Sequence, residues 1–183
     1  MVVRTSTFRL GFTKRSPNRI VEPRGSCHGA RSLLEILPFS ECQVSDTPHV
    51  TITRRLQFNA AHRVHNPALS EEENRATFGK CNNPNWHGHN YTLDVSVRGP
   101  VDQRTGYVVD LGRLKAIVER EVIDKVDHRN FNLEVDFMTG TIPTTENIIV
   151  AMWRVLLPAI APARLRRLTL WETPNNYVEY DGA

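Results

Sequence analysis

Two segments of the chain alternate between apolar and polar residues, which is the pattern of strands that bury one face. Ordered structure is expected to begin near His49, and the apolar residues of the first segment are Val50, Ile52, Leu56 and Phe58. Those of the second segment, residues 90–99, are Tyr91, Leu93, Val95 and Val97. Turn-forming residues over 99–106 then lead to a short expected strand over residues 107–109. Strands joined by such a loop indicate an antiparallel hairpin.

From Asp110 the apolar residues recur at intervals of three and four, which predicts a helix with Asp110 as its N-cap. Its apolar stripe is Leu111, Leu114, Val118, Val122 and Val126. A second helix is expected after Pro143, capped by Thr144 or Thr145 and ended by Pro158. Its stripe is Ile148, Ile149, Met152, Trp153, Leu156 and Leu157.

The chain is expected to end with a strand over residues 165–172, a turn at residues 174–176 and a short strand over residues 177–180. Strands followed by helices and a further strand are the order of an α+β fold, with the helices on one face of an antiparallel sheet. The sequence therefore predicts a four-stranded antiparallel sheet with two helices on one face, in one domain over residues 48–183.

Composition separates the leading segment from this domain. The formal net charge is +3, yet residues 1–34 hold seven basic residues and one acid, so the remainder is slightly acidic. Residues 1–47 are expected to form a largely disordered N-terminal extension. Its Arg-rich, Ser-containing, acid-poor composition is similar to that of an organelle transit peptide, which makes organelle targeting the alternative to a cytoplasmic location.

Several classes of partner are not expected. No stretch approaches the roughly 18 to 20 consecutive apolar residues of a membrane span, so no membrane partner is predicted. The domain has no clustered Lys and Arg with stacking aromatic residues, so no nucleic-acid partner is predicted. Cys27, Cys42 and Cys81 are an odd number at spacings that suit no disulfide framework, which favours a reducing compartment such as the cytoplasm.

The strongest chemical signal is His87-Gly88-His89 at the head of the second strand. Two histidines separated by one residue project to the same side of a strand, so both can reach one ion, and zinc suits them. His62, just past the first strand, is the best third ligand. His65 competes with it, but their odd separation points them to opposite faces of an extended segment. Three imidazoles leave a fourth position open, which is typical of a catalytic zinc site.

Cys81 has three roles open to it: a fourth zinc ligand, a buried apolar residue or a reactive thiol. A reactive thiol needs a base, and Asp127-His128 is a candidate because the carboxylate can orient the imidazole that takes the thiol proton. By itself this dipeptide is more typical of a helix C-terminus. Glu172 ends an apolar strand, where its carboxylate could bind the two N–H donors of an aminopyrimidinone ring or remain an exposed strand end.

Together these motifs resemble the 6-pyruvoyl-tetrahydropterin synthase family. The resemblance covers residues 49–182 and is carried by the segments 58–63, 78–91, 127–130, 144–147 and 171–176. By that resemblance the zinc ligands are His62, His87 and His89, the catalytic thiol is Cys81 with Asp127 and His128 as its helpers, and Glu172 anchors the pterin. Thr144, Thr145 and Glu146 resemble residues that help to line the pterin pocket.

The resemblance also implies the tunnelling fold, in which subunits join their sheets into a barrel, usually as a homohexamer of two trimers with sites between subunits. Such a barrel would leave no exposed sheet edge. The implied reaction converts 7,8-dihydroneopterin triphosphate to 6-pyruvoyl-tetrahydropterin and inorganic triphosphate, with zinc as a Lewis acid on the side-chain hydroxyls and Cys81 moving protons. Cations near the motifs that could bind the triphosphate are Arg54, Arg55, Arg63 and Lys80.

Two alternatives remain. The 6-carboxy-tetrahydropterin synthases use similar ligands, but their thiol usually stands three residues before the first histidine of the pair, whereas here five residues, 82–86, intervene. A relative that binds zinc or a pterin without turnover would have no use for Cys81 together with Asp127 and His128. Trp86 stands where many members of the family have a small residue, which predicts a differently shaped loop between the thiol and the metal.

Overall fold

The structure is a computed structural model, and it describes residues 47–183. The expectations for residues 1–46, including Cys27 and Cys42, lie outside the described residues. Within residues 47–183, no helix combines the length and the apolar composition that crossing a membrane requires.

Two long strands form the centre of the sheet. β1 (His49–His62) and β2 (His87–Pro100) pair antiparallel along their full lengths, from His49 opposite Pro100 to His62 opposite His87. The predicted start at His49 is confirmed, and both strands extend further than the apolar alternation alone indicated. Because of that extension, the three histidines lie within or at the end of the paired strands.

The sheet has five strands in the order β3-β1-β2-β4-β5, and it is mixed. β4 (Arg164–Thr173) pairs antiparallel with β2, and β5 (Asn176–Tyr180) pairs antiparallel with β4. β3 (Arg129–Asn130) pairs parallel with β1. The prediction of a four-stranded antiparallel sheet is therefore wrong, because β3 adds a short parallel strand at the edge, whereas the α+β class is confirmed.

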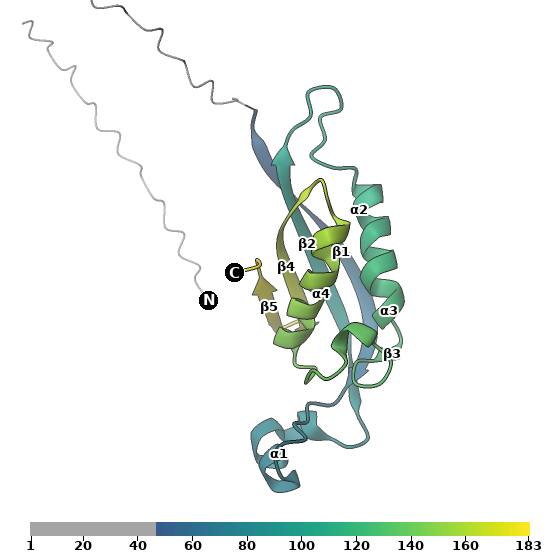
Figure 1. Cartoon of the computed structure of the whole chain (residues 1–183), viewed down its shortest axis with the longest axis vertical. Coiled ribbons are helices and arrows are strands. Elements are labelled where there is room, and N and C mark those ends of the chain that lie inside the picture. Colours follow the sequence, from purple (N-terminus) through teal and green to yellow (C-terminus); the bar gives the residue numbers. More distant parts are fainter. Residues whose placement is uncertain (1–46) are drawn as a thin grey trace, which may run out of the picture. The chain divides into compact units, whose positions relative to one another are not determined.

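Two helical segments cover the same face of this sheet (Figure 1). The first is α2 (Leu111–Val118), a π-helical turn η2 (Glu119–Ile123) and α3 (Asp124–Val126). Its predicted cap is confirmed, because the Asp110 carboxylate accepts from the backbone N–H groups of residues 112 and 113 at 2.6 and 3.1 Å. The second is α4 (Thr145–Ala159), which runs one residue past the predicted end at Pro158.

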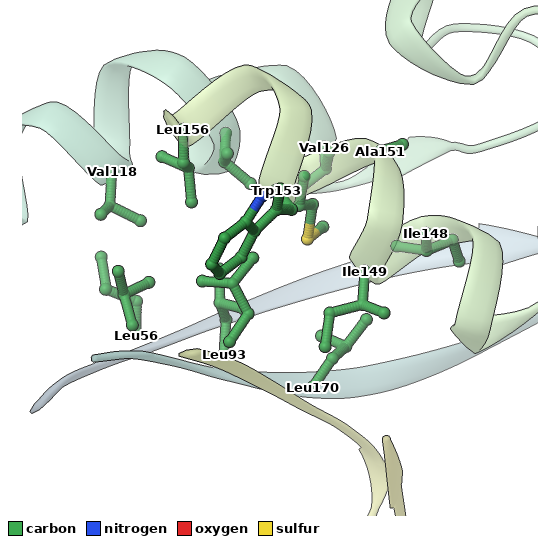
Figure 2. Close-up of a cluster of buried hydrophobic side chains, with 14 of the residues drawn as sticks. Leu56, Leu93, Val118, Val126, Ile148, Ile149, Ala151, Trp153, Leu156 and Leu170 are labelled. Carbon is green, nitrogen blue, oxygen red and sulfur yellow. The ribbon is translucent and has the colours of Figure 1, made fainter. Parts of the chain in front are cut away.

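The core lies between the helices and the sheet. Figure 2 shows side chains of α4, α2 and α3 packed over those of β1, β2 and β4. The residues that fill this layer include Leu56, Leu93, Val118, Val126, Ile149, Leu156 and Leu170, all buried. Leu157 was predicted in the apolar stripe of α4, and that prediction is wrong, because the residue is 51% exposed. Leu111 of the α2 stripe is also exposed.

The strand predicted over residues 107–109 is also wrong. The Asp102 side chain accepts from the backbone N–H groups of Arg104 and Thr105 at 2.9 and 2.8 Å, and the Asp102 N–H donates to the Tyr107 carbonyl at 2.9 Å. Gly106 has a φ of +72°, in the left-handed region that glycine enters without strain. The segment therefore bonds to itself as a compact turn and has no strand partner.

Between β1 and β2 the chain forms α1 (Glu71–Phe78) and a 3₁₀ turn η1 (Gly79–Asn82), neither of which was predicted. A capping box starts α1, because Ser70 and Glu73 each bond the other's backbone N–H. A further 3₁₀ turn, η3 (Asp136–Met138), precedes α4. Figure 1 shows α1 beyond the end of the sheet where β1 ends and β2 begins, the end that carries the histidines.

Candidate metal centre and active site

The paired strands bring three histidines together. His62 lies directly opposite His87, and His89 follows two residues along β2, opposite Ala60. Since side chains alternate between the faces of a strand, all three share the helix-covered face. One ligand atom of each histidine lies within 4.8 Å of those of the other two, which is the geometry of a group that can hold a metal ion. This is the set that the sequence predicted.

His62 is arranged as a metal ligand. Its side chain is 1% exposed, and its Nδ1 lies 2.8 Å from the carbonyl oxygen of Pro143, just before α4. A carbonyl only accepts, so Nδ1 carries the proton and Nε2 presents its lone pair to the group. That Nε2 is buried and has no hydrogen-bond partner among residues 47–183, which leaves it suited to a metal.

The neutral imidazole form is favoured in this group. Burial, with a further contribution from neighbouring His87 and His89, lowers the pKa of His62 below its usual value. Burial, followed by the charge of His89, also lowers the pKa of His87. Metal ions bind neutral imidazole, so both shifts favour metal binding over protonation.

The strand between the two ligands of β2 requires Gly88. A Cβ there would lie 3.0 Å from the carbonyl oxygen of Ala60, which is tighter than ordinary contact. The histidine pair therefore depends on glycine for the close approach of β1. His65, the alternative ligand, lies outside the group, and its Nδ1 accepts from the side-chain amide of Asn82 at 3.0 Å.

Glu172 of β4 lies beside the histidines. Its Oε1 is 3.6 Å from His62 Nε2 and 3.7 Å from His89 Nε2, and it accepts a hydrogen bond from the Thr145 hydroxyl at 2.9 Å. Glu172 therefore has a hydrogen-bond partner and lies next to the three histidines, so it is not an exposed strand end without a partner. Of its predicted neighbours, Thr144 caps α4 by accepting from a backbone N–H, and Glu146 is exposed in the first turn.

Cys81 opens onto the same region. It lies in η1, is exposed, and lines an open pocket of about 820 Å³ together with His87 and His89. Its carbonyl accepts from the Val64 N–H at 2.8 Å, which holds the turn against the chain that leaves β1. The thiol and two of the imidazoles therefore share one pocket, whose size is typical of small-molecule sites.

Asp127 and His128 form the expected pair, but the pair lies away from the pocket of Cys81. His128 Nδ1 lies 3.0 Å from Asp127 Oδ2, and Asp127 Oδ1 accepts from the Asn59 N–H at 2.8 Å. This second hydrogen bond is the main cause that lowers the pKa of Asp127. The pair contacts β1 at Asn59, five residues before the contact of Cys81 at Val64, and the His128 ring is 80% exposed. Within the described part of one chain, the pair does not line the pocket of Cys81.

Sequence reasoning missed several parts of this site. The Pro143 carbonyl that orients His62 is a backbone group and leaves no signal in the residue pattern. Arg75 of α1 lines the Cys81 pocket, and it was missed because α1 itself was not predicted. Trp86, directly before His87, was singled out from the sequence, but its φ of +65° was not predicted, and this value is uncommon for a residue with a large side chain.

The fold and the site can be compared with known proteins. Residues 51–183 match the family model described as 6-pyruvoyl tetrahydropterin synthase. The chain is 42% identical over 140 residues to the 6-pyruvoyl tetrahydrobiopterin synthase of Drosophila melanogaster, covering 76% of this chain and 83% of the relative. It is 41% identical over 131 residues to the human protein of the same name, covering 72% and 90%.

A solved structure agrees with both. The 6-pyruvoyl tetrahydropterin synthase of Caenorhabditis elegans superposes with a TM-score of 0.72 at 45% identity, covering 75% of this chain and 98% of that one. The matches to this family cover most of the chain, and residues 51–183 include the three-histidine group and all of the sheet after Val50. The chain belongs to the 6-pyruvoyl tetrahydropterin synthase family.

Proposed function

We propose that this chain is a metal-dependent lyase that converts 7,8-dihydroneopterin triphosphate to 6-pyruvoyl-tetrahydropterin and releases inorganic triphosphate. One observation carries the proposal: three imidazoles converge beside the carboxylate of Glu172, and two of them, His87 and His89, share a pocket with the Cys81 thiol. The names of the relatives at 41–42% identity support this reaction. The catalytic domain is assigned to residues 48–183.

The metal is assigned to His62, His87 and His89. Three nitrogen donors with room for a further ligand favour zinc, and zinc bound there supplies Lewis acidity to the hydroxyls of the substrate side chain. His62 and His87 contribute by staying neutral, because burial lowers the pKa of both. The Pro143 carbonyl contributes by fixing the His62 ring.

Glu172 is assigned to anchor the pterin ring. Each oxygen of a carboxylate accepts more than one hydrogen bond, so the bond from Thr145 to Oε1 leaves room for two N–H donors of the ring. The bond from Thr145 also limits the rotation of the Glu172 side chain. Thr144 and Glu146, which begin the same helix, are assigned to the wall of the pterin pocket.

Cys81 is assigned to move protons between the carbon atoms of the side chain, with Asp127 and His128 as the pair that accepts the thiol proton. In one chain this pair lies at Asn59, away from the pocket of Cys81. A site formed between subunits would bring the pair of one copy to the thiol of another. This separation supports a site formed between subunits, and the assembly proposed for it is the homohexamer of two trimers that the family resemblance implies.

The test is turnover of 7,8-dihydroneopterin triphosphate by the purified, zinc-loaded full-length chain, with the product identified by mass spectrometry. Cys81→Ala should keep its zinc and lose about 10²- to 10⁴-fold in kcat, the usual contribution of a positioned acid or base. Cys42→Ala is the matched cysteine control and should keep its kcat.

Three results would contradict the proposal. Absence of wild-type turnover would favour a binding protein, and full activity of Cys81→Ala would remove the thiol from the mechanism. Acetaldehyde as a product would assign the chain to the carboxy-forming reaction.

A further inference from the structure

The pocket that holds Cys81, His87 and His89 also carries an excess of positive charge. Arg63, Arg75 and Lys80 line it, against a single carboxylate from Glu71. We propose that Arg63, Arg75 and Lys80 form the subsite that binds the triphosphate of the substrate. This inference rests on the proposed function, and it goes beyond it by assigning the leaving group to named residues.

The three cations come from separate elements. Arg63 follows β1, Arg75 lies in the last turn of α1, and Lys80 lies in the η1 turn beside Cys81. Neither Arg75 nor Lys80 forms an ion pair or a side-chain hydrogen bond with any residue in the range 47–183. Like charges gathered in one pocket repel each other, so a bound polyanion would stabilise them.

Arg63 is held in position before any ligand binds. Its Nε donates to the Asn82 carbonyl at 3.0 Å and its Nη2 to Asn82 Oδ1 at 3.2 Å. Asn82 is itself 3% exposed and donates to the Val64 carbonyl at 2.9 Å. Arg63 Nη2 also lies 3.7 Å from Oε2 of the exposed Glu71, a longer contact than the 2.7 Å bonds between Arg55 and Asp94, and Nη1 has no partner among residues 47–183. A fixed, planar guanidinium suits phosphate oxygens better than a freely rotating one.

The other two cations named from the sequence fit this role less well. Arg55 forms a two-bond ion pair with Asp94, at 2.7 Å for each bond, so its charge is already compensated. Arg55 lines a different pocket, and Arg54 is not among the residues that line the Cys81 pocket. A basic residue at a helix C-terminus also complements the helix dipole, and this effect alone would explain the position of Arg75. It would not explain why three cations line the pocket that contains His87 and His89.

The proposed position has a chemical consequence. When triphosphate leaves, negative charge develops on its bridging oxygen, and cations held there stabilise that charge. The same pocket lies beside Cys81, which is assigned to remove the proton in the elimination. Substrate would therefore lie with its ring at Glu172, its side chain at the histidines and its triphosphate against η1 and α1.

The first experiment is calorimetric titration of the zinc-loaded full-length chain with inorganic tripolyphosphate, after removal of unbound metal. A double variant, Arg75→Gln with Lys80→Gln, should weaken binding by about 100-fold, since each charged hydrogen bond contributes about tenfold. Arg104→Gln is the matched control, because Arg104 is exposed in the loop after β2, and it should bind like wild type. Equal affinity of the double variant and wild type would overturn the subsite.

A second measurement separates this inference from the proposed function. The double variant should raise KM for 7,8-dihydroneopterin triphosphate but bind 7,8-dihydroneopterin, which has no phosphate, as wild type does. Turnover with an unchanged KM in the double variant would refute the subsite and leave the reaction standing. Tripolyphosphate binding that depends on Arg75 and Lys80, without any wild-type turnover, would refute the reaction and leave an anion site.

Discussion

Trp86 has a strained backbone conformation in the loop before the metal ligands, and substitutions there can measure that strain. Its φ of +65° lies in the left-handed region, which costs a residue with a Cβ about 1–2 kcal/mol. The Trp86 N–H donates to the Asn83 carbonyl at 3.0 Å, so a turn keeps the residue in this conformation directly before His87. The loop therefore carries strain that glycine would not.

Two substitutions isolate that strain. Trp86→Ala and Trp86→Gly both remove the indole, and only the alanine variant keeps a Cβ in the left-handed region. Glycine avoids the cost of the left-handed conformation, but its unfolded chain is more flexible, which lowers its stability by about 0.5–1 kcal/mol relative to alanine. The glycine variant is therefore expected to be more stable than the alanine variant by about 0.5–1 kcal/mol, a rise in Tm of roughly 1–4 °C.

Thermal unfolding of both variants, at one protein concentration and one metal concentration, measures this difference. The matched control is Ala116, exposed in α2, where Ala116→Gly should lower the stability by up to about 1 kcal/mol. The preference between glycine and alanine thus reverses between the two positions. If Trp86→Ala is as stable as Trp86→Gly, Trp86 is not held in the left-handed conformation and the description of the loop is wrong.

Three further predictions concern the site. The Tyr91 hydroxyl is buried without a hydrogen-bond partner among the described residues, so Tyr91→Phe should raise the free energy of unfolding by about 1 kcal/mol, and a decrease in denaturant titration would show that the hydroxyl has a partner. Thr145→Val removes the hydrogen bond to Glu172 and should raise KM for the pterin substrate about tenfold at equal zinc content, whereas an unchanged KM would argue against this role. Because burial lowers the pKa values of His62 and His87, the unfolded chain binds protons first, and the metal-free protein should lose stability as the pH falls below about 6.5. His62→Gln should reduce that loss in denaturation curves recorded across this range, and an unchanged loss would contradict the assignment.

Much of the sheet could be predicted because its residues follow a simple period. The alternation in β1 and β2 fixes which face is buried, and with it the shared face of His62, His87 and His89. The cap at Asp110 was predicted from a local rule, since its carboxylate needs only the two backbone N–H groups that follow. These features depend on neighbours in sequence or on one repeating pattern.

The errors arise where tertiary contacts decide the structure. β3 has two residues and exists because it pairs with Ala60 and Ala61 of β1, which no local pattern announces. The segment 107–109 has strand-forming residues, but the hydrogen bonds of Asp102 close a turn first. α1 had a detectable signal in the capping box of Ser70 and Glu73, although its helix is too polar to show an apolar stripe.

The site shows the same division. Spacing in the sequence identified the three histidines, whereas the separation of Cys81 from Asp127 and His128 within one chain depends on where α3 ends against β1. From the sequence alone, Glu172 could have been an exposed strand end without a partner. Its hydrogen bond with Thr145 of α4 shows that it has one. Contacts between elements that are distant in the sequence cannot be predicted from the spacing of residues.

The central claim is that three imidazoles hold one metal ion, and the most direct test is zinc stoichiometry and affinity of the full-length chain. Wild type and His65→Ala should each bind one zinc per chain with equal affinity. His62→Ala should bind more than about 100-fold more weakly, and so should His89→Ala, whose side chain is 21% exposed and whose loss disturbs packing less. Undiminished zinc binding by His62→Ala and His89→Ala, or its loss in His65→Ala, would contradict the account.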